Sequence, residues 1–211
     1  MKAEVLIVGG TLSTRDVNVP YSTVVLLRGE GRNVLVDPGS FATHQALERR
    51  LSELGLKPED ITDVLLTHFH LDHAYASKYF ENATVHLHRA YREKDYSKFG
   101  PIVGKEYISV MKNWKEVNEL KGGEILFGVV KVFHTPWHAR EHLSFLIRTD
   151  NLGTLFLPGD ICFTRLDYYE MYKGYRKGEA VDFVLEMAQK ADLIVFTHDE
   201  PLKPLSRARR V

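Results

Sequence analysis

Thr67-His68-Phe69-His70-Leu71-Asp72-His73 follows directly on the apolar run Val64-Leu65-Leu66 and places four potential metal ligands within six positions. If the apolar run is a strand, His68 and His70 project from the same face, because side chains alternate along a strand. The chain must then turn for Asp72 and His73 to point back into the same space. Imidazole nitrogens and a carboxylate suit zinc, or iron or manganese. A His-rich surface turn is the alternative, but the spacing favours a metal site.

The length and composition of the chain indicate a globular protein. A chain of 211 residues can form one large α/β domain or two small ones, with a sizeable core in either case. Hydrophobic residues make up 44% of it and charged residues 27%, which is ordinary for such a protein. No Pro/Ser-rich linker, repeat or low-complexity tract divides the sequence. We therefore expect a single domain over residues 1–211.

Charge, cysteine content and hydropathy restrict the partners and the compartment. Lys plus Arg and Asp plus Glu number 28 each, so no global field attracts nucleic acid or anionic lipid. Cys162 is the only cysteine, which excludes a disulfide framework and suggests a reducing compartment. The apolar stretch near Met1 is too short for a signal peptide, and no run approaches the roughly 20 apolar residues of a membrane span. The sequence predicts a cytoplasmic protein without a membrane partner.

Hydrophobic periodicity predicts strand-rich halves with interspersed helices. Residues 5–8, 22–28 and 33–36 have the pattern of strands, with a hairpin turn at 29–32. Apolar residues at helical spacing predict a helix over 44–54. Further helices are predicted over 74–80, 89–98, 108–120 and 179–190, and further strands over 61–66, 84–87, 124–127, 129–133, 142–148, 154–157 and 193–196. Two packed sheets covered by helices would accommodate this pattern.

Three more ligand candidates stand where predicted strands end. His138 follows the strand 129–133 in Thr135-Pro136-Trp137-His138, Asp160 follows Gly159, and His198 follows the strand 193–196. The rim of a sheet is where sites are built on a rigid scaffold. Taken alone, each residue has a structural explanation, as a turn cap, an acceptor for backbone donors or a helix cap.

The order of these motifs resembles that of the metallo-β-lactamase superfamily. H-x-H-x-D-H at 68–73 is followed by T-P-x-H, then G-D, then a terminal strand ending in His. Val36-Asp37-Pro38-Gly39 also matches an early element of that family, so the resemblance spans about residues 20 to 200. It implies an α/β fold, a four-layer αββα sandwich with the site at one edge of the two sheets.

The resemblance also implies the ligand set. One metal would be held by His68, His70 and His138 and a second by Asp72, His73 and His198, with Asp160 bridging the two. The expected cofactors are two divalent ions, zinc first, with iron or manganese as alternatives. Asp37 is predicted to fix a ligand histidine rather than to bind metal. Trp137 departs from the Gly usual before the third His and would narrow one side of the pocket.

Such a site predicts hydrolysis of a small-molecule ester, lactone or thioester. Two ions about 3.5 Å apart can share a hydroxide nucleophile, because metal binding lowers the pKa of water to roughly 7. Asp72 and Asp160 would take part in catalysis, whereas Cys162 is predicted to serve packing. The segment after Asp160 resembles that of N-acyl homoserine lactonases, in which a Tyr positions the substrate carbonyl. Tyr168 or Tyr169 could supply that phenol.

Several predictions around the site stay open. The alternative for Tyr168 and Tyr169 is an aromatic stripe, with Tyr172 and Tyr175, that packs a surface helix. His142 either orients its neighbours or lines the pocket. Residues 91–99, which include Arg92, Lys94, Tyr96 and Lys98, are candidates for a rim over the site. The 10 Tyr and 11 Phe leave room for a homodimer interface.

Other functions compete with the hydrolase. A persulfide dioxygenase would use the same first site with a single iron, held by two His and an Asp. A nuclease is disfavoured because the chain is short and net neutral, and the basic tail 207–210 is interpreted as a solvated terminus. Hydrolysis of β-lactams is disfavoured in a cytoplasmic chain. A non-catalytic metal module is disfavoured because seven candidate ligands without Cys exceed a structural need.

Overall fold

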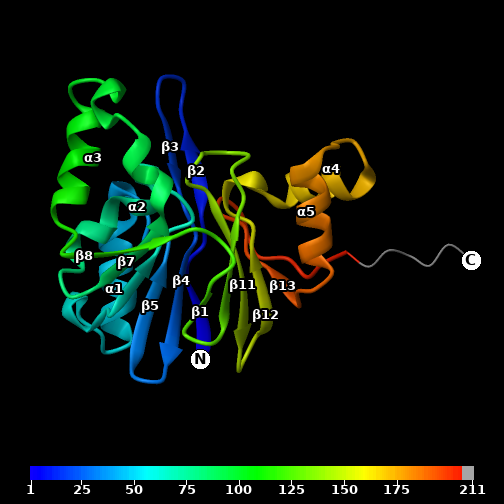
Figure 1. The fold of residues 1–211 in the computed structure, drawn as a ribbon, viewed down its shortest axis with the longest axis horizontal. Coiled ribbons are helices and arrows are strands. Elements are labelled where there is room, and N and C mark those ends of the chain that lie inside the picture. The colour runs from blue at the N-terminus through cyan, green and yellow to red at the C-terminus, as the bar shows by residue number, and fades with distance from the viewer. Residues whose placement is uncertain (206–211) are drawn as a thin grey trace, which may run out of the picture.

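Two β-sheets lie face to face between two layers of helices in the computed structural model, which describes residues 1–205 (Figure 1). The predicted α/β fold with αββα layers is confirmed. The basic tail 207–210 lies outside the described residues. No helix among residues 1–205 is long and apolar enough to cross a membrane.

The first sheet carries the leading ligand motif. Its six strands lie in the order β1-β4-β5-β6-β7-β8, and the pairs from β5 to β8 are parallel. Parallel strands end at the same edge, so residues that follow them are brought together. The strands are β1 (Lys2–Ile7), β4 (Val24–Gly29), β5 (Arg32–Val36), β6 (Asp63–Leu65), β7 (Thr84–His88) and β8 (Glu116–Leu120).

The second sheet carries the later motifs. Its strand order is β13-β12-β11-β10-β9, with β12 and β13 parallel and the remaining pairs antiparallel. A separate hairpin, β2–β3, projects beyond the sheets (Figure 1). The strands are β2 (Gly10–Ser13), β3 (Asn18–Tyr21), β9 (Ile125–Leu126), β10 (Val130–His134), β11 (Leu143–Thr149), β12 (Gly153–Leu157) and β13 (Leu193–Ile194).

Helices cover the outer face of each sheet, with α1, α2 and α3 beside the first sheet and α4 and α5 beside the second (Figure 1). They are α1 (His44–Glu53), α2 (Leu71–Ala74), α3 (Val103–Lys112), α4 (Arg165–Lys173) and α5 (Glu179–Ala188). Short 3-10 helices are η1 (Phe41–Thr43), η2 (Pro58–Asp60), η3 (Tyr75–Tyr79), η4 (Arg89–Glu93), η5 (Tyr96–Phe99) and η6 (Gly159–Ile161).

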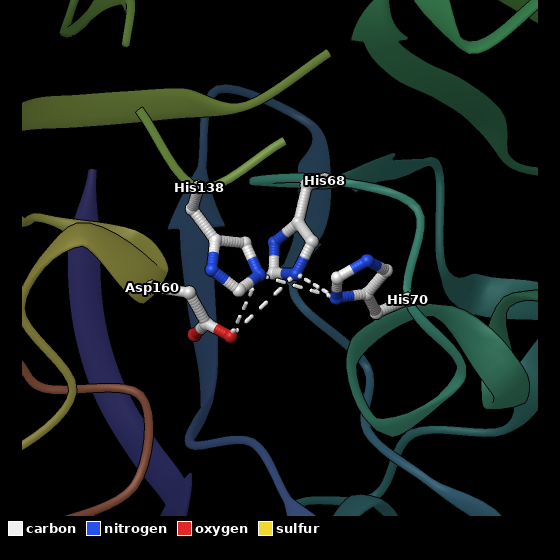
Figure 2. Close-up of side chains that lie close together, drawn as sticks. All are labelled: His68, His70, His138 and Asp160. Carbon is white, nitrogen blue, oxygen red and sulfur yellow. Dashed lines mark hydrogen bonds and ion pairs between the residues drawn. The ribbon is translucent and has the colours of Figure 1, made fainter. Parts of the chain in front are cut away.

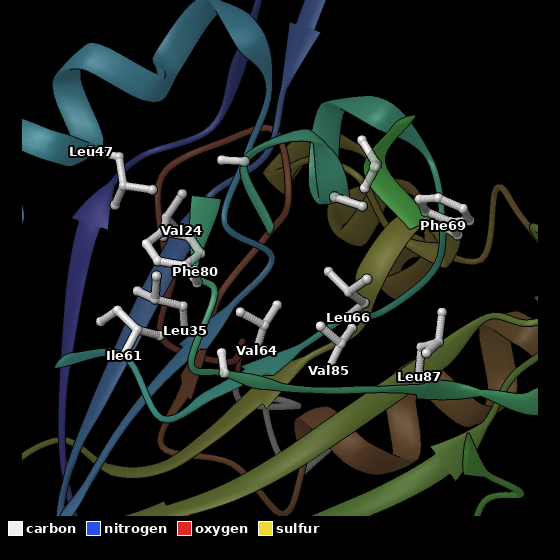
Figure 3. Packing of buried hydrophobic residues seen from close by; sticks show 14 of the residues in the cluster. Val24, Leu35, Leu47, Ile61, Val64, Leu66, Phe69, Phe80, Val85 and Leu87 are labelled. Atoms are coloured by element: carbon white, nitrogen blue, oxygen red, sulfur yellow. The ribbon is translucent and has the colours of Figure 1, made fainter. Parts of the chain in front are cut away.

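Strands β4, β5 and β6 in the middle of the first sheet are largely buried on both faces, which explains their apolar runs. In β5, Leu35 points to the helices and belongs to the same apolar cluster as Leu47 of α1 (Figure 3). Its neighbours Val34 and Val36 point to the second sheet. A third cluster lies between the second sheet and the last two helices. Three apolar layers therefore hold the two sheets and their helices in fixed positions.

Two predicted helices differ from the structure. Residues 108–120 were expected to be one helix, but α3 ends at Lys112 and β8 pairs with β7. Val117 and Leu120 are three positions apart, which imitates helical spacing, and pairing at the sheet edge overrides that local pattern. Residues 89–98 form two short 3-10 helices, η4 and part of η5, rather than one helix. The hairpin β2–β3 and the full extent of α4 were not predicted.

Candidate metal centre

All seven predicted metal ligands lie together at one edge of the two sheets. His68 and His70 follow β6, and Asp72 and His73 belong to α2, where the chain turns back as the motif required. The other three come from the second sheet: His138 after β10, Asp160 in η6 after β12, and His198 after β13. They form two groups whose ligand atoms lie within 4.8 Å of one another.

The first group contains three histidines and one oxygen of Asp160, and their side chains point toward one another (Figure 2). His70 Nδ1 lies 2.9 Å from His68 Nε2 and 3.2 Å from His138 Nε2. Asp160 Oδ2 lies 3.6 Å from His68 Nε2 and 3.4 Å from His138 Nε2. Three imidazole nitrogens and one carboxylate oxygen form a donor set that suits zinc or a similar ion.

The second group contains two histidines and two carboxylates. His73 Nε2 lies 3.5 Å from Asp72 Oδ2 and 3.3 Å from Asp160 Oδ1. His198 Nε2 lies 3.6 Å from each of the same two oxygens. Asp160 therefore presents Oδ2 to the first group and Oδ1 to the second.

Buried hydrogen bonds fix the orientation of Asp160. Its backbone N–H donates to His142 Nε2 at 2.9 Å, and Thr197 Oγ1 donates to its Oδ1 at 2.8 Å. His142 is fully buried, and its Nδ1 lies 2.8 Å from Thr135 Oγ1. Of the two roles left open for His142, the structure therefore favours orienting neighbours over lining the pocket.

Asp37 orients the first motif from behind. Its Oδ1 accepts from the Thr67 N–H at 2.8 Å, and its Oδ2 accepts from Thr67 Oγ1 at 2.7 Å. The same Oδ2 lies 2.9 Å from His73 Nδ1, so the other ring nitrogen, Nε2, faces the second group. This carboxylate–histidine arrangement is typical of the groups behind metal ligands. The contact fits the supporting role predicted for Asp37.

The histidines of the first group are held neutral, as metal ligands must be. Burial lowers the pKa of His68 well below its ordinary value, and the nearby His73 charge adds to the effect. Burial and the neighbouring His138 lower the pKa of His70 to about 4. The pKa of His138 is lowered as well, chiefly by burial. Each ring therefore has a free lone pair at neutral pH.

The second group has an excess of negative charge that favours a cation. Burial alone would lower the pKa of His73, but the carboxylates of Asp160, Asp37 and Asp72 raise it well above its ordinary value. His73 Nε2 is buried and has no hydrogen-bond partner among the described residues, although carboxylate oxygens surround it. A ring nitrogen and several carboxylates that converge without closing hydrogen bonds fit a divalent cation at this position.

A groove of about 730 Å³ opens beside both groups. It is lined by β3, residues 40–42, α2 and α3, and both His70 and Asp72 reach it. Phe163 bounds an adjoining hollow that also reaches Asp72, Asp160 and His198. The Phe163 ring lies 5.7 Å from the ring of His138 and 5.8 Å from that of His198, one residue from each group. It is the aromatic side chain placed across the centre.

The two predicted phenols lie elsewhere. Tyr168 is buried in the cluster beneath α4 and α5, and its hydroxyl accepts from the Leu205 N–H at 3.3 Å. Tyr169 is exposed on α4, where Lys173 packs against its ring. The structure contradicts a substrate-facing role for Tyr168 and gives Tyr169 no contact with the centre. The alternative, an aromatic stripe on a helix, fits both residues better.

Two other expectations near the site can be compared with the structure. Cys162 is buried, and burial raises the pKa of its thiol, which fits the predicted packing role. Trp137 packs against Phe183 of α5, with ring centroids 5.7 Å apart, rather than over the ligands. The prediction that Trp137 narrows the pocket is therefore not supported.

The sequence profile of the Metallo-beta-lactamase superfamily matches residues 17–198, which include all seven ligand candidates. The chain belongs to the metallo-beta-lactamase superfamily. A Thermotoga maritima protein assigned to the metallo-beta-lactamases has a crystal structure that superposes with a TM-score of 0.92. It is 49% identical, and the match covers 96% of this chain and 99% of that one.

The curated relatives of this chain include lactonases. An N-acyl homoserine lactonase of Bacillus cereus is 26% identical, over 87% of this chain and 75% of its own length. The N-acyl homoserine lactonase AiiB of Agrobacterium fabrum is 29% identical, over 75% of this chain and 68% of its own length. The chain is a metal-dependent hydrolase of the superfamily, as predicted.

Some residues that surround the centre carry little signal in the sequence. Phe163 stands three positions after Asp160, within the segment predicted to contact substrate, but it lacks the hydroxyl on which that prediction rested. Lys94 and Glu141 form an ion pair between loops that are 47 positions apart, so no local pattern connects them. Thr197 immediately precedes His198, but no motif in the sequence marks it as a residue of the site.

Proposed function

We propose that this chain is a dinuclear metal-dependent hydrolase of a small lactone, ester or thioester. The observation that carries the proposal is the position of Asp160, whose two carboxylate oxygens each face a separate group of ligands. A single metal would need only one of those groups. We also propose that residues 1–211 form one domain, since the ligands come from both halves of the chain.

Two divalent ions at these groups would supply a hydroxide nucleophile at neutral pH and would polarise the substrate carbonyl. His68, His70, His138 and Asp160 would hold one ion, and Asp72, His73, His198 and Asp160 the other. Zinc suits these donors best, with iron or manganese as alternatives.

The carboxylates can also act on protons and orientation. Burial opposes the ionisation of Asp72, but the nearby His73 charge outweighs it and lowers the Asp72 pKa. Asp72 reaches both the groove and the adjoining hollow, so its carboxylate is placed to pass a proton toward a leaving group. Asp160 is buried and its carboxylate is held by Thr197, so it would orient the two ions rather than pass protons.

A lactone is the favoured substrate within this class. The curated relatives named N-acyl homoserine lactonases support a cyclic ester. The groove beside Asp72 is bounded by Val19, Phe41 and Val103, which would accept an apolar portion of a small molecule. Phe163, rather than Tyr168 or Tyr169, lies across the centre, so positioning of the carbonyl would rest on the metals.

The test begins with the metal content of protein purified without added metal or chelator. Elemental mass spectrometry should find close to two divalent ions per chain, and the same preparation should hydrolyse lactones, with esters and thioesters assayed alongside. Chelation should abolish the activity, and added zinc should restore it. Close to one iron per chain, with oxygen uptake on glutathione persulfide, would instead establish the dioxygenase alternative.

A further inference from the structure

An ion pair with an unusual burial lies beside the first group of ligands. The Glu141 side chain is 0% exposed, and its Oε1 accepts from Lys94 Nζ at 2.5 Å. Glu141 Oε2 has no hydrogen-bond partner among the described residues. The Lys94 side chain is 23% exposed, so the pair joins a fully buried anion to a cation that reaches solvent.

The pair connects two segments that border the centre. Glu141 stands between β10 and β11, three positions after His138 and directly before His142. Lys94 stands between η4 and η5, in the segment considered as a rim of the site. Tyr96 of the same segment packs on Phe69, which stands between His68 and His70, with ring centroids 5.0 Å apart, so the segment lies beside the first motif.

The ammonium of Lys94 has donors to spare. A lysine ammonium carries three N–H donors. Glu141 is the one side-chain partner found for it in the part of the chain that the structure describes. Arg165, another cation near the ligands in sequence, is instead paired with Asp199 by two of its nitrogens. Lys94 is therefore the cation with free donors on the side of the first group.

A link that only joined the two segments would not require an ion pair such as that of Lys94 and Glu141. Removing a carboxylate and an ammonium from water costs more than packing apolar side chains of similar size in the same place. Here the buried Glu141 fixes the head of a long, flexible side chain whose outer donors stay free. That arrangement holds a positive charge at a defined point, and such a charge recognises an anion.

We propose that Lys94 binds a carboxylate of the substrate and that Glu141 positions Lys94 for this role. The inference rests on the proposed hydrolase and narrows its substrates to lactones, esters or thioesters that carry an acidic group on the acyl side. The carboxylate would lie against Lys94 while the scissile carbonyl faces the ligand groups. Lys94 becomes a specificity-determining residue, and Glu141 a positioning residue.

The test compares two esters with the same leaving group in the metal-loaded enzyme. One is the para-nitrophenyl monoester of glutaric acid, and the other is the para-nitrophenyl ester of pentanoic acid, which has a methyl group in place of the carboxylate. The measured quantity is the ratio of their kcat/KM values.

The variants are Lys94→Arg, Glu141→Gln and the double variant Lys94→Met with Glu141→Gln, which avoids leaving a buried carboxylate unpaired. Lys98→Met is the matched control, since Lys98 lies on the same segment but is exposed and pairs only loosely with Asp95.

The unaltered enzyme should favour the anionic ester, and the double variant should lower the ratio about tenfold through KM, the loss of one charge-assisted hydrogen bond. Glu141→Gln should also lower the ratio, but by less than the double variant, because Lys94 keeps its charge and loses the anion that positions it. Lys94→Arg should keep the preference, as should Lys98→Met. A structural link would instead make Glu141→Gln and the double variant lose activity on both esters alike.

Two results overturn the inference, and both differ from failure of the proposed function. An unaltered enzyme that hydrolyses both esters without charge preference removes the role of Lys94 but leaves the hydrolase in place. A ratio that stays the same in the double variant, in protein with full metal content and an unchanged unfolding midpoint, does likewise. Absence of metal-dependent hydrolysis of every ester and lactone would instead refute the hydrolase itself.

Discussion

The molecule contains two buried clusters of histidine and aspartate, and they differ in how their hydrogen bonds are used. In the first sheet, His86 Nε2 lies 2.8 Å from Asp63 Oδ1, and its Nδ1 lies 2.9 Å from Asn118 Nδ2. Asp63 Oδ2 accepts from Arg32 at 2.9 Å and from Thr62 at 2.7 Å. In this cluster both ring nitrogens and both carboxylate oxygens have partners.

The candidate metal centre contains the same residue types, but not all of their buried polar atoms have hydrogen-bond partners. His73 Nε2 is buried without a hydrogen bond among the described residues, and His68 Nε2 faces His70 Nδ1 at 2.9 Å. Two lone pairs that meet at this distance need a proton or a cation between them. Buried polar groups are normally satisfied, so a converging set that is not satisfied marks a ligand site. Saturation of hydrogen bonds, rather than residue type, separates the structural cluster from the functional one.

The largest expected effect comes from Asp160, because it belongs to both groups of ligands. Asp160→Asn keeps the shape and removes the charge, so we expect metal content to fall from two ions per chain to one or fewer. The loss of hydroxide generation and carbonyl polarisation is worth several kcal/mol, which lowers kcat/KM by about three orders of magnitude or more. Elemental analysis and initial rates on a lactone measure both quantities.

Asp63→Asn is the matched control for that experiment. It alters a buried aspartate of the cluster of Asp63 and His86, called the saturated cluster here because its ring nitrogens and carboxylate oxygens all have partners. It should retain two ions per chain and most of the rate at temperatures well below its unfolding midpoint. If Asp63→Asn lost metal while Asp160→Asn kept it, the distinction between the two clusters would be wrong.

A smaller effect is expected from Asp37, which lies behind the ligands. Asp37→Asn removes the anion that holds His73 Nδ1 at 2.9 Å and leaves the direct ligands in place. Groups in this position typically contribute 10- to 100-fold to metal affinity, so we expect a loss in about that range. Competition with a chelator measures the affinity, and activity should return at raised zinc concentration. An affinity within about twofold of the unaltered protein would show that Thr67 and packing alone orient His73.

Much of the fold follows from local patterns, with exceptions where tertiary pairing decides. The apolar runs that form β4, β5, β11 and β12 are visible in the sequence, because strands buried on both faces need them. Strand β8 is not visible: three of its five residues, Glu116, Asn118 and Glu119, are polar, and only pairing with β7 makes it a strand. Similarly, the exposed β2–β3 hairpin has little apolar content to distinguish it from a loop.

The seven candidate ligands could be selected from the sequence, whereas the residues around them could not. His68, His70, Asp72 and His73 follow from spacing alone, and the other three from their order along a known family pattern. Tyr168 lies away from the centre because its selection rested on a functional group and not on reach, and a substrate contact of Tyr169 stays a prediction. Phe163, three residues after Asp160, is close enough to lie across the centre, whereas the helix α4 carries later residues away. Contacts between distant loops, such as Lys94 with Glu141, have no local pattern at all.

The smallest effect on function, and a clear effect on stability, is expected at the saturated cluster. Asp63→Asn weakens charge-assisted hydrogen bonds from His86, Arg32 and Thr62 to a side chain that is 3% exposed. We expect the free energy of unfolding to fall by about 2 kcal/mol, the usual value of hydrogen bonds to a buried charged group. Denaturant titration measures it. Glu81, which is exposed and paired with Lys115, provides the control, and Glu81→Gln should change stability by less than about 0.5 kcal/mol.

The difference in the free energy of unfolding between the unaltered protein and Asp63→Asn should depend on pH if it is electrostatic in origin. Burial alone would raise the pKa of Asp63, but hydrogen bonds from His86, Thr62 and Arg32 outweigh it and lower the pKa below 3.8. A lowered pKa in the folded state stabilises the protein above the unfolded-state pKa, and this stabilisation is lost as the pH falls through the folded-state pKa. The stability gap between the unaltered protein and Asp63→Asn should therefore be widest above about pH 5 and should narrow on acidification below pH 3.8. Titration of the metal-centre carboxylates affects both proteins equally and cancels in the difference. A gap that stayed constant from pH 7 to pH 3 would mean that the variant loses packing rather than charge, and that the saturated cluster contributes no ionic stabilisation.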